Sequence, residues 1–484
     1  MKRLVSGILA LCLCLPPAAP IVQLQSQQVC AAEVEEVAIV DGLIYKATIK
    51  GEEYTSLMLV GMEDANADSV TIPAAVNGCP VFLPMIAADA FQDCKNLQNI
   101  YVAEDREDDL HSIEGVLYRN NTLLVYPQGR EGAYSIPEGT TAVGEKAFQN
   151  AQKLTRLTLP ESLELIQGMA FYKCTALEEI IGAVPSDNAS LFYHCSALKS
   201  VEFAEPSNSE KKIYAPRFHE CDSLETIIFP ENCHIIDSVN IRSCPSLKSL
   251  TLPRLVGELY IASCENLQTL NLSEVDTGGS KWDEAVIIRD CNSLEMLDIS
   301  EVKEGNISIA GCAGLKQLYN TKMDNRYEFS LEDCAELESM SLEGSFDAEI
   351  KDCPKLQKLD AYGNSGYLSI ANCPELTTVN CFNKVGFTLL EQVDQLTVYG
   401  EEEFRDIQSS CEEWGIPFVI RTAIKGDVNG DTEVNILDVI AVNKAILGVA
   451  LLDDAQKEAA DMDGNGTIDA ADSLALLKCV LGIV

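Results

Sequence analysis

The sequence predicts a repeat solenoid built on a parallel β-sheet, followed by a small all-α domain at the C-terminus. The first observation is a motif of the form Cys-x-x-Leu-x-x-[Leu/Ile/Val], which recurs every 19 to 27 residues along most of the chain up to residue 398. The second is an unrelated twofold repeat, with an offset of 34 residues, that fills 426–484. At 484 residues the chain is long enough for both domains and their caps.

The N-terminus has the layout of a secretory signal peptide. Met1 is followed by two basic residues and by an apolar run from Leu4 to Leu15, which is too short to span a bilayer. We expect residues 1–32 to be removed by cleavage after Ala32, with Ala19 as the alternative position. None of the three cysteines in this segment follows the small residue that a lipoprotein signal needs, so we expect export without a lipid anchor.

Both ends of a solenoid need covers, because a terminal turn would otherwise expose apolar surface and strand edges. Residues 33–86, with strand-like runs at 42–48 and 56–60, are expected to form the N-terminal cap. Residues 401–425 are expected to form the C-terminal cap and a short linker, with a strand at 417–420. Four side chains of this segment share one helical face: Phe404, Ile407, Cys411 and Trp414.

About twelve copies of the motif lie within 87–400, and each is predicted to supply one short parallel strand and a turn back. We call its cysteines the repeat cysteines. They are Cys94, Cys174, Cys195, Cys221, Cys244, Cys264, Cys291, Cys312, Cys334, Cys353 and Cys373, with Ala151 and Val393 in the same place. Twelve strands spaced by about 4.8 Å give a rod of roughly 55 Å.

The period of 20 to 30 residues around Leu-x-x-Leu-x-Leu is the signature of a leucine-rich repeat, and the details resemble the BspA-like class of surface repeats. An Ala-Phe pair precedes the cysteine position, as in Ala147-Phe148 and Ala170-Phe171, and a hairpin is interposed at 115–127. The resemblance is strong up to about residue 230. Beyond it the Ala-Phe pair disappears and the spacing becomes irregular.

The chain has 19 cysteines, and in an exported protein this number raises the question of disulfides. Neighbouring repeat cysteines are predicted about 5 Å apart, which is within reach of a bridge. A small buried thiol suits the same position, and the exchange with Ala151 and Val393 favours it. The sequence leaves both states open.

One column of the predicted sheet faces outward and is the candidate binding face of the repeats. From Asn271 onward it is polar, and such side chains bind peptide groups or sugar hydroxyls, although a solvated sheet face has the same composition. The column reads Tyr101, Thr158, Ile181, Glu202, Ile228, Thr251, Asn271, Asp298, Tyr319, Ser341, Asp360 and Asn380.

The twofold repeat at 426–484 has short oxygen-bearing side chains at positions 1, 3, 5, 9 and 12 of each loop, with a backbone carbonyl at position 7. This spacing is typical of a loop that wraps Ca²⁺ with six or more oxygens, whereas Mg²⁺ prefers to keep its waters. The candidate ligands are Asp427, Asn429, Asp431, Glu433, Asn435 and Asp438 in the first loop, and Asp461, Asp463, Asn465, Thr467, Asp469 and Asp472 in the second.

An amphipathic helix follows each loop, but no helical period precedes the first one, in contrast to a paired EF-hand. This loop-helix form resembles the type I dockerin of cellulosomal proteins over 426–484. The resemblance implies a domain that folds around two Ca²⁺ ions and inserts into a cohesin module of a scaffolding protein. It also implies cohesin contacts at Ile436, Leu437, Asn443, Lys444, Ala470, Ala471, Leu477 and Lys478.

Two departures from the dockerin pattern carry expectations. Position 6 of the first loop is Thr432, where the second loop has Gly466, so we expect the first calcium site to be the weaker one. Positions 10 and 11 differ between the halves, being Ile-Leu in one and Ala-Ala in the other. Dockerins with matching halves bind in two orientations, so here we expect one.

Charge and motifs narrow the function. A formal net charge of −40 argues against phosphate backbones and anionic membrane surfaces, which leaves proteins, cations and neutral glycans. There is no Gly-x-Ser-x-Gly elbow, and His194 and His219 lack the paired Cys-x-x-Cys of a zinc site. Caps, repeats and loops occupy almost every residue after 38, so we expect no catalytic domain.

Three functions stay open. The favoured one is a secreted, non-catalytic component, attached at the cell surface to a cellulosome-like scaffold, whose repeats bind a protein or a glycan. The others are a glycoside hydrolase of polysaccharide breakdown and a cell-surface adhesin.

Overall fold

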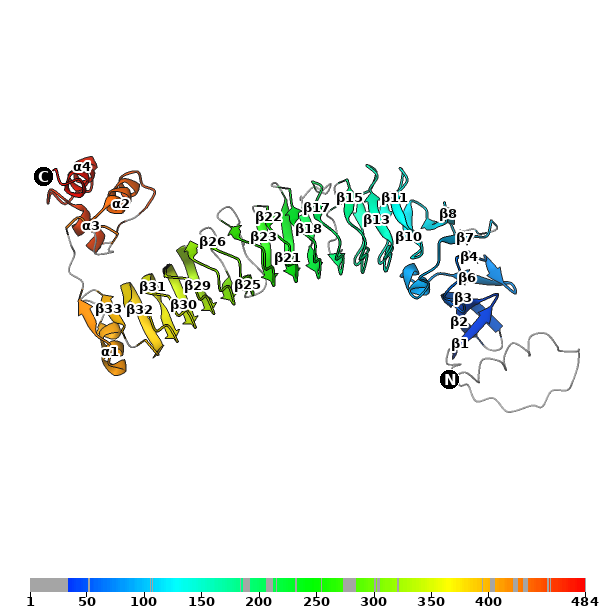
Figure 1. The fold of residues 1–484 in the computed structure, drawn as a ribbon, viewed down its shortest axis with the longest axis horizontal. Coiled ribbons are helices and arrows are strands. Elements are labelled where there is room, and N and C mark those ends of the chain that lie inside the picture. The colour runs from blue at the N-terminus through cyan, green and yellow to red at the C-terminus, as the bar shows by residue number, and fades with distance from the viewer. Residues whose placement is uncertain are drawn as a thin grey trace, which may run out of the picture.

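The computed structural model describes residues 34–483, apart from 51–52, 105, 107, 183, 186–191, 206–211, 215, 231–232, 254, 273–283, 300–301, 303–304, 320–321, 394, 401–404, 421–424, 430–433, 451 and 453. The expected signal peptide at 1–32 lies outside these residues. The described chain is a long parallel β-solenoid with a strand-rich cap at its N-terminal end and helices at its C-terminal end (Figure 1). Within the described part, no helix is long and apolar enough to cross a membrane.

The predicted N-terminal cap is a five-stranded sheet in the order β1-β2-β3-β6-β5. Alternate side chains of its long strands, Tyr45 and Leu59 among them, are buried against the 3-10 helix η1. The elements of this region are β1 (Val34–Val40), β2 (Leu43–Lys50), β3 (Glu53–Met62), β5 (Ala75–Val76), β6 (Cys79–Phe82), η1 (Ala87–Phe91) and the parallel pair β4 (Ser69–Ile72) with β7 (Asn99–Val102).

The predicted hairpin follows as antiparallel strands that lead into the first parallel rungs. Val116 and Leu123 lie inside the molecule, and β10 then pairs in parallel with the next turn. The strands are β8 (Leu110–Ile113), β9 (Val116–Arg119), β10 (Thr122–Val125), β12 (Ala142–Val143) and β14 (Leu165–Ile166).

The predicted column of short strands forms three small parallel sheets rather than one continuous sheet. In each of these turns a loop separates the short strand from the next strand along the chain. Their strands are β11 (Gly132–Ser135), β13 (Leu154–Thr158) and β15 (Glu179–Ile181), then β17 (Ser200–Glu202), β20 (Thr226–Ile228) and β22 (Ser249–Thr251), then β24 (Thr269–Asn271), β26 (Met296–Asp298) and β28 (Gln317–Tyr319).

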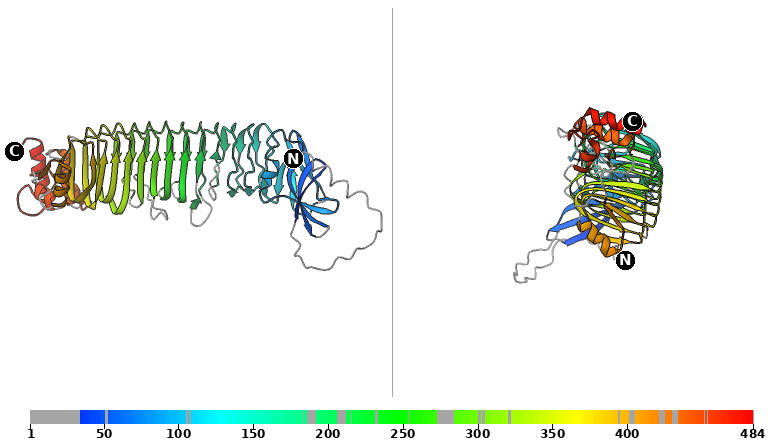
Figure 2. Two further views of the ribbon diagram at one scale, coloured as in Figure 1. Left: turned by 90° about the horizontal axis from the view of Figure 1, so that it is seen from below. Right: turned by 90° about the vertical axis from the view of Figure 1, so that its left-hand side faces the viewer.

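A second, 13-stranded parallel sheet runs along the other side of the solenoid (Figure 2). Apart from β18, β33 and β34, each of its strands ends just before a repeat cysteine or Val393. They are β16 (Phe192–Tyr193), β18 (Lys212–Tyr214), β19 (Arg217–His219), β21 (His234–Arg242), β23 (Leu255–Ala262), β25 (Glu284–Arg289), β27 (Asn306–Ala310), β29 (Lys322–Glu332), β30 (Ser339–Lys351), β31 (Lys358–Ala371), β32 (Thr378–Glu391), β33 (Thr397–Gly400) and β34 (Phe418–Ile420).

The prediction of one strand per turn is therefore wrong from β16 onward, where each turn supplies residues to two strands or to one long strand. The segment before the cysteine alternates apolar and polar residues, as in Val239-Asn-Ile-Arg242, and this period-2 pattern favours a strand. Turn length decides whether the two strands join. From Cys334 to Cys353 a turn has 19 residues, too few for a loop between them, and β30 runs continuously through 13 residues.

The interior is a stack of identical positions, one from each turn. The residue three before the cysteine position pairs in register along the sheet, and its side chain is buried in each turn up to that of Cys373. In the N-terminal half it is phenylalanine, so Phe148, Phe171, Phe192 and Phe218 form a ladder with ring centroids 5.3–5.5 Å apart. In later turns isoleucine or leucine takes the place of this phenylalanine and is equally buried. The Ala-Phe pair is therefore lost from the sequence beyond residue 230 while the fold continues.

Each Cys-x-x-Leu segment makes the same tight turn. In one example Leu247 N donates to Cys244 O at 3.1 Å, and Ser243 before it has φ 53°, the left-handed conformation that ends the strand. Both the cysteine and the leucine are buried. The motif is therefore a corner of the solenoid that turns the chain from the large sheet towards the short strands.

The described cysteines are thiols. Several donate to the backbone of the preceding turn, as Cys174 Sγ does to Phe148 O at 3.1 Å. Burial raises the pKa of the Cys174 thiol to about 12, so this sulfur stays protonated and unreactive at neutral pH.

The predicted C-terminal cap is α1 (Arg405–Trp414) followed by β34, which adds the last rung. Ile407 and Cys411 are buried against the repeats, but Trp414 is 40% exposed and does not complete the predicted apolar face. Phe404 lies outside the described residues. Three further helices follow: α2 (Ile436–Ile446), α3 (Asp454–Ala460) and α4 (Ala470–Val480).

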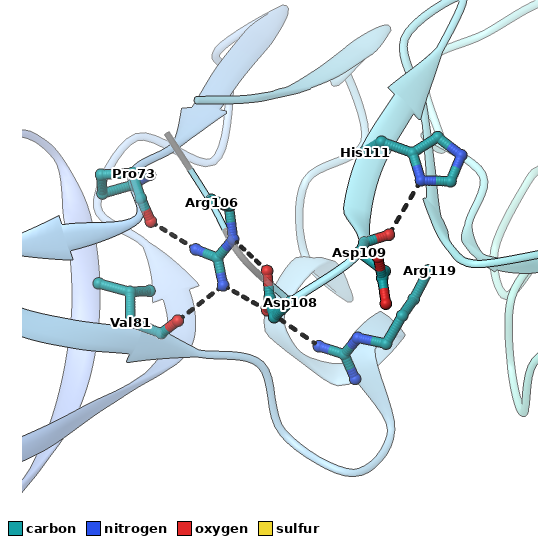
Figure 3. Close-up of polar contacts among 7 residues, drawn as sticks. All are labelled: Pro73, Val81, Arg106, Asp108, Asp109, His111 and Arg119. Atoms are coloured by element: carbon teal, nitrogen blue, oxygen red, sulfur yellow. Dashed lines mark hydrogen bonds and ion pairs between the residues drawn. The ribbon is translucent and has the colours of Figure 1, made fainter. Parts of the chain in front are cut away.

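A buried arginine ties the N-terminal cap to the first repeats (Figure 3). The Arg106 guanidinium donates to the carbonyls of Pro73 and Val81 and makes two bonds to the Asp108 carboxylate, at 2.6–2.8 Å. Its side chain is only 5% exposed. The side-chain bond from Arg106 lowers the pKa of Asp108, assisted by the charges of Arg106 and Arg119 and opposed by partial burial.

We expect Arg106→Ala to loosen the cap by about 2 kcal/mol, because it leaves two carbonyls and one carboxylate without their donor. Since the pKa of Asp108 is lowered on folding, its contribution is complete above the pKa of an unfolded aspartate, about 3.9, and is lost as pH falls towards the lowered pKa. Hydrogen exchange of β3 and β6 as a function of pH measures both effects. Arg119→Ala is the control, since its guanidinium is half-exposed and 3.7 Å from Asp108. Equal exchange in wild type and Arg106→Ala would contradict this role.

Candidate metal centre in the C-terminal repeat

Each predicted loop leads into a helix whose first turn carries the carboxylate of position 12. Asn435 caps α2 and accepts from Leu437 N at 2.8 Å, while Asp438 reaches back to Asn435 N. Asp469 and Asp472 repeat this capping box at the start of α4. The local sequence thus fixes the position-12 carboxylate at a helix N-terminus, where the dipole favours negative charge.

In the first loop, Asp438 is fully buried and organises the backbone around it. Its Oδ1 accepts from Val428 N and Asn429 N at 2.8 and 2.9 Å. Asp427 is also buried. The predicted ligands Asp431 and Glu433 lie outside the described residues.

In the second loop, three carboxylates converge. Single oxygens of Asp461, Asp463 and Asp472 all lie within 4.8 Å of one another. Two oxygens on opposite sides of a Ca²⁺ ion are about 5 Å apart, given bonds of about 2.3–2.6 Å, so these three fit around one ion. The oxygen-only donor set is the chemistry that Ca²⁺ prefers.

The backbone of the second loop folds around Asp461. This carboxylate accepts from the amides of Gly464, Asn465 and Gly466 at 2.8–3.0 Å. The bond from Gly466 is the largest cause that lowers the pKa of Asp461, and the other two amides add to it against partial desolvation. The carboxylate is therefore charged and oriented for a cation.

Asn465 and Thr467 also lie in this loop. Asn465 Nδ2 donates to Asp463 Oδ2 at 2.9 Å, and Thr467 N donates to Asn465 Oδ1 at 2.7 Å. Asp469 acts as the helix cap and is exposed. The structure thus brings Asp461, Asp463 and Asp472 together and places the remaining predicted residues around them.

Comparison with known proteins identifies both domains. A family model described as the dockerin type I domain matches residues 425–481, and one described as the BspA type leucine rich repeat region matches six copies over 132–209 and 186–316. The chain carries a BspA-type leucine-rich repeat region and a type I dockerin domain. Type I dockerins bind calcium, and proteins with these modules are typically extracellular. No curated protein matches the chain.

Solved bacterial leucine-rich repeat proteins are similar to it. One from Eubacterium ventriosum is 21% identical, with a TM-score of 0.35, over 47% of this chain and 59% of that protein, so the chain spans less than two thirds of that relative. One from Bacteroides ovatus is 14% identical, with a TM-score of 0.32, over 79% of this chain and 99% of that one. A leucine rich cell surface protein from Faecalibacterium prausnitzii is 16% identical, with a TM-score of 0.28, over 60% and 96%.

The dockerin core contains a helix that the sequence reading missed. α3 precedes the second loop and buries Ala459 and Ala460 between the two loop-helix units. Its seven residues are short and its sequence, Asp-Ala-Gln-Lys-Glu-Ala-Ala, is mostly polar, so it lacks the apolar period that marked the other helices. The adjacent Ala459 and Ala460 were the residues that could have indicated a buried helix face in this segment.

The predicted cohesin-contact residues of the dockerin are mostly at its surface. Ile436 and Leu437 are 51% and 54% exposed, whereas Leu477 is half-buried. Asn443 accepts from Ser473 Oγ at 2.8 Å, which links the two helices. The other four, Lys444, Ala470, Ala471 and Lys478, are exposed. Further exposed apolar side chains on α2 and α4 were not predicted: Ile440, Ile446, Leu447, Leu474 and Leu481.

The predicted outward column of the repeats is exposed at its bulky positions. Tyr101, Ile181, Ile228 and Tyr319 are 40–49% exposed. At the C-terminal end the prediction is wrong, because Asn380 is 2% exposed. Its Nδ2 donates to Asp360 Oδ1, its register partner on the preceding turn, in the part of the rod where β31 and β32 are continuous long strands.

The histidines beside the repeat cysteines are not arranged as zinc ligands. His194 Nδ1 lies 2.7 Å from Glu220 Oε2 on the next turn. Across the described residues, the one group of three or more metal-ligating side chains is Asp461, Asp463 and Asp472.

Proposed function

We propose that the protein is a secreted, non-catalytic component that docks through its dockerin onto a cohesin-bearing scaffold and presents the repeat rod to a protein or glycan ligand. The setting is a cellulosome-like assembly at the cell surface, concerned with polysaccharide breakdown. The observation that carries the proposal is the convergence of the three second-loop carboxylates under a capped helix, in a loop repeated 34 residues away.

The division of labour follows the chain. Residues 1–32 direct export, 33–86 cap the rod, 87–400 form it, 401–425 close it and link it, and 426–484 dock. The repeat core is a continuous stack of apolar side chains between the caps, which supports a role in binding and spacing rather than in chemistry.

The dockerin holds two Ca²⁺ ions, one in each loop. Asp427, Asn429, Asp431, Asn435 and Asp438, with the Glu433 carbonyl, hold the first. Asp461, Asp463, Asn465, Asp469 and Asp472, with the Thr467 carbonyl, hold the second. When bound, each ion neutralises its carboxylates and joins the loop to the helix that follows. The second loop binds its ion more tightly, because Gly466 at position 6 takes the left-handed conformation, φ 79°, that the sharp turn needs. The first loop has Thr432 at this position.

Cohesin binds the dockerin in a single orientation. Ile436 and Leu437 give the start of α2 an exposed apolar pair, while Ala470 and Ala471 give the start of α4 two small side chains. Asn443, Lys444, Leu477 and Lys478 complete the contact surface on the two helices. Because the halves differ in shape where they meet the partner, a surface that fits one does not fit the other.

Capture of the full chain by an immobilised panel of type I cohesin modules tests the proposal. We expect at least one cohesin to retain the chain in calcium and to release it in EDTA. The double variant Ile436→Ala/Leu437→Ala is expected to weaken capture more than about tenfold, while Leu481→Ala, at the far end of α4, serves as the control. Capture that persists in EDTA, or retention by no cohesin, would contradict docking.

A further inference from the structure

The outer face of the 13-stranded sheet carries a row of basic and aromatic side chains that no predicted site includes. In the turns that end at Cys221, Cys244, Cys264 and Cys291, the residues three and five before the cysteine are buried, so the strand positions two and four before it lie on the outer face. Six successive turns of this face each offer a cation or a hydroxyl, and we call this row the basic strip. It consists of Lys173, which lies at the corner immediately before Cys174, and of Tyr193, Arg217, Arg242, Tyr260 and Arg289, which lie two or four residues before their cysteines. Strand pairing places the last five on β16, β19, β21, β23 and β25, which are successive neighbours in the large sheet.

Contacts between rungs order the side chains of the strip. The Tyr193 ring stacks on His219 of the next rung, with centroids 5.5 Å apart. The Arg242 guanidinium lies over the Tyr260 ring, 4.0 Å from its centroid, and Lys173 Nζ lies 5.1 Å from the centroid of Tyr172. A guanidinium held flat on a ring keeps its N–H groups in one plane, which suits a carboxylate.

The arginines of the strip have spare hydrogen-bonding capacity. Among the described residues, no carboxylate lies within 4.0 Å of the nitrogens of Arg217, Arg242 or Arg289. Arg242 Nε is buried and has no hydrogen-bond partner in the described structure. The nearby Glu220 is engaged by His194. An anionic ligand would therefore not have to displace an existing ion pair.

Charge along this one face reverses sign. At the positions one, two and four residues before the cysteine, the strip turns carry four basic residues against two acidic ones, Glu220 and Asp290. The same positions in the turns from Cys312 to Val393 carry one basic residue, Lys351, against five acidic ones: Glu332, Asp333, Glu349, Asp352 and Glu391. In a chain of net charge −40, the strip is thus a local basic surface.

We propose that the basic strip binds an acidic polysaccharide whose sugar residues carry carboxylates, a polyuronate. Rungs follow one another at about 4.8 Å, so the six turns span about 24 Å. A linear chain of six-membered sugar rings advances by roughly one ring per rung, and can present a carboxylate or hydroxyl to each turn. An extended acidic peptide is out of step, because its side chains on one face recur only every 6.6 Å or so.

The overall negative charge does not prevent this binding. At physiological ionic strength the screening length is about 8 Å, so the acidic turns beyond Cys312 act weakly on a ligand seated over β19 and β21. The arginines are in direct contact with it and form charge-assisted bonds that are much less screened. The expectation drawn from net charge, of proteins, cations or neutral glycans as partners, does not take this local basic surface into account.

The inference rests on the proposed role of the rod as a binding surface, but not on docking. Calorimetric titration of the full chain with a galacturonate hexamer tests it. We expect the hexamer to bind, its methyl ester to bind at least about tenfold more weakly, and Arg242→Gln or Arg217→Gln to weaken binding by about tenfold each. Lys351→Gln removes the same charge from the same file of the sheet and should change the affinity less than about twofold.

Far-UV circular dichroism of the same preparations shows whether the rod of each variant is folded, and cohesin capture, which reports on the dockerin, separates a failure of the strip from a failure of docking. Equal affinity for the hexamer and its methyl ester, or equal effects of Arg242→Gln and Lys351→Gln, would overturn the proposal. Tighter binding of a matched glutamate hexamer would also overturn it, in favour of an acidic protein segment.

Discussion

Asp472→Asn is expected to reduce the number of calcium ions bound by the chain from two to one. Asp472 is buried at position 12 of the second loop, where its carboxylate accepts from Asp463 N and Asp469 N and converges with Asp461. Asparagine keeps the shape and one acceptor but removes the charge and one of the two oxygens. We expect calcium affinity at this loop to fall by at least about 100-fold, since a charged ligand interaction is worth about 3 kcal/mol. Calorimetric calcium titration counts the ions.

The chain supplies a matched control for this variant. Asp469→Asn removes the same charge three residues earlier, and the first loop already carries an asparagine, Asn435, as the equivalent cap. We expect Asp469→Asn to retain two ions and cohesin capture. If Asp472→Asn still bound two ions with wild-type affinity, the assignment of the second loop would be wrong.

Phe171→Ala is expected to destabilise the rod by about 3–5 kcal/mol. The Phe171 side chain is fully buried, and its ring lies between those of Phe148 and Phe192 with centroids 5.5 and 5.4 Å away. Each turn contacts only its neighbours, so a cavity at this rung weakens both interfaces. Urea denaturation followed by tyrosine fluorescence measures the loss.

Phe171→Leu is the control for this prediction, because the turns beyond β19 use isoleucine and leucine at the same position. We expect it to cost less than half as much as the alanine substitution. A loss below about 1 kcal/mol for Phe171→Ala would show that the aromatic ladder does not hold the N-terminal turns together.

The repeat could be predicted in outline because the same residue types, Cys and Leu, recur at the buried corner of almost every turn. Cys-x-x-Leu marks a corner in each turn, and the same columns are buried in the structure. The second strand of each turn was missed because its pattern depends on neighbours. Val239-Asn-Ile-Arg242 is too short to stand out alone, and it forms a strand because the equivalent segment of the next turn, Leu259-Tyr-Ile-Ala262, pairs with it.

Local ligand spacing made the calcium loops readable, since all positions fall within twelve residues and the loop repeats. Features that depend on how the turns stack could not be predicted from the sequence. The basic strip joins residues from six turns, and the chain-wide charge of −40 conceals it. Asn380 is buried where it pairs with Asp360 on one side and Tyr399 on the other, residues that belong to the preceding and following turns.

Chelation of the wild-type chain, followed by hydrogen exchange of its separate elements, tests the account most directly. If two calcium ions organise the tail into a docking domain, EDTA will remove amide protection from α2 and α4 and leave β30, β31 and β32 protected. Added calcium will restore protection, first in α4 and then in α2. Helices that stay equally protected in EDTA, in a chain that still associates with cohesin, would contradict the central claim.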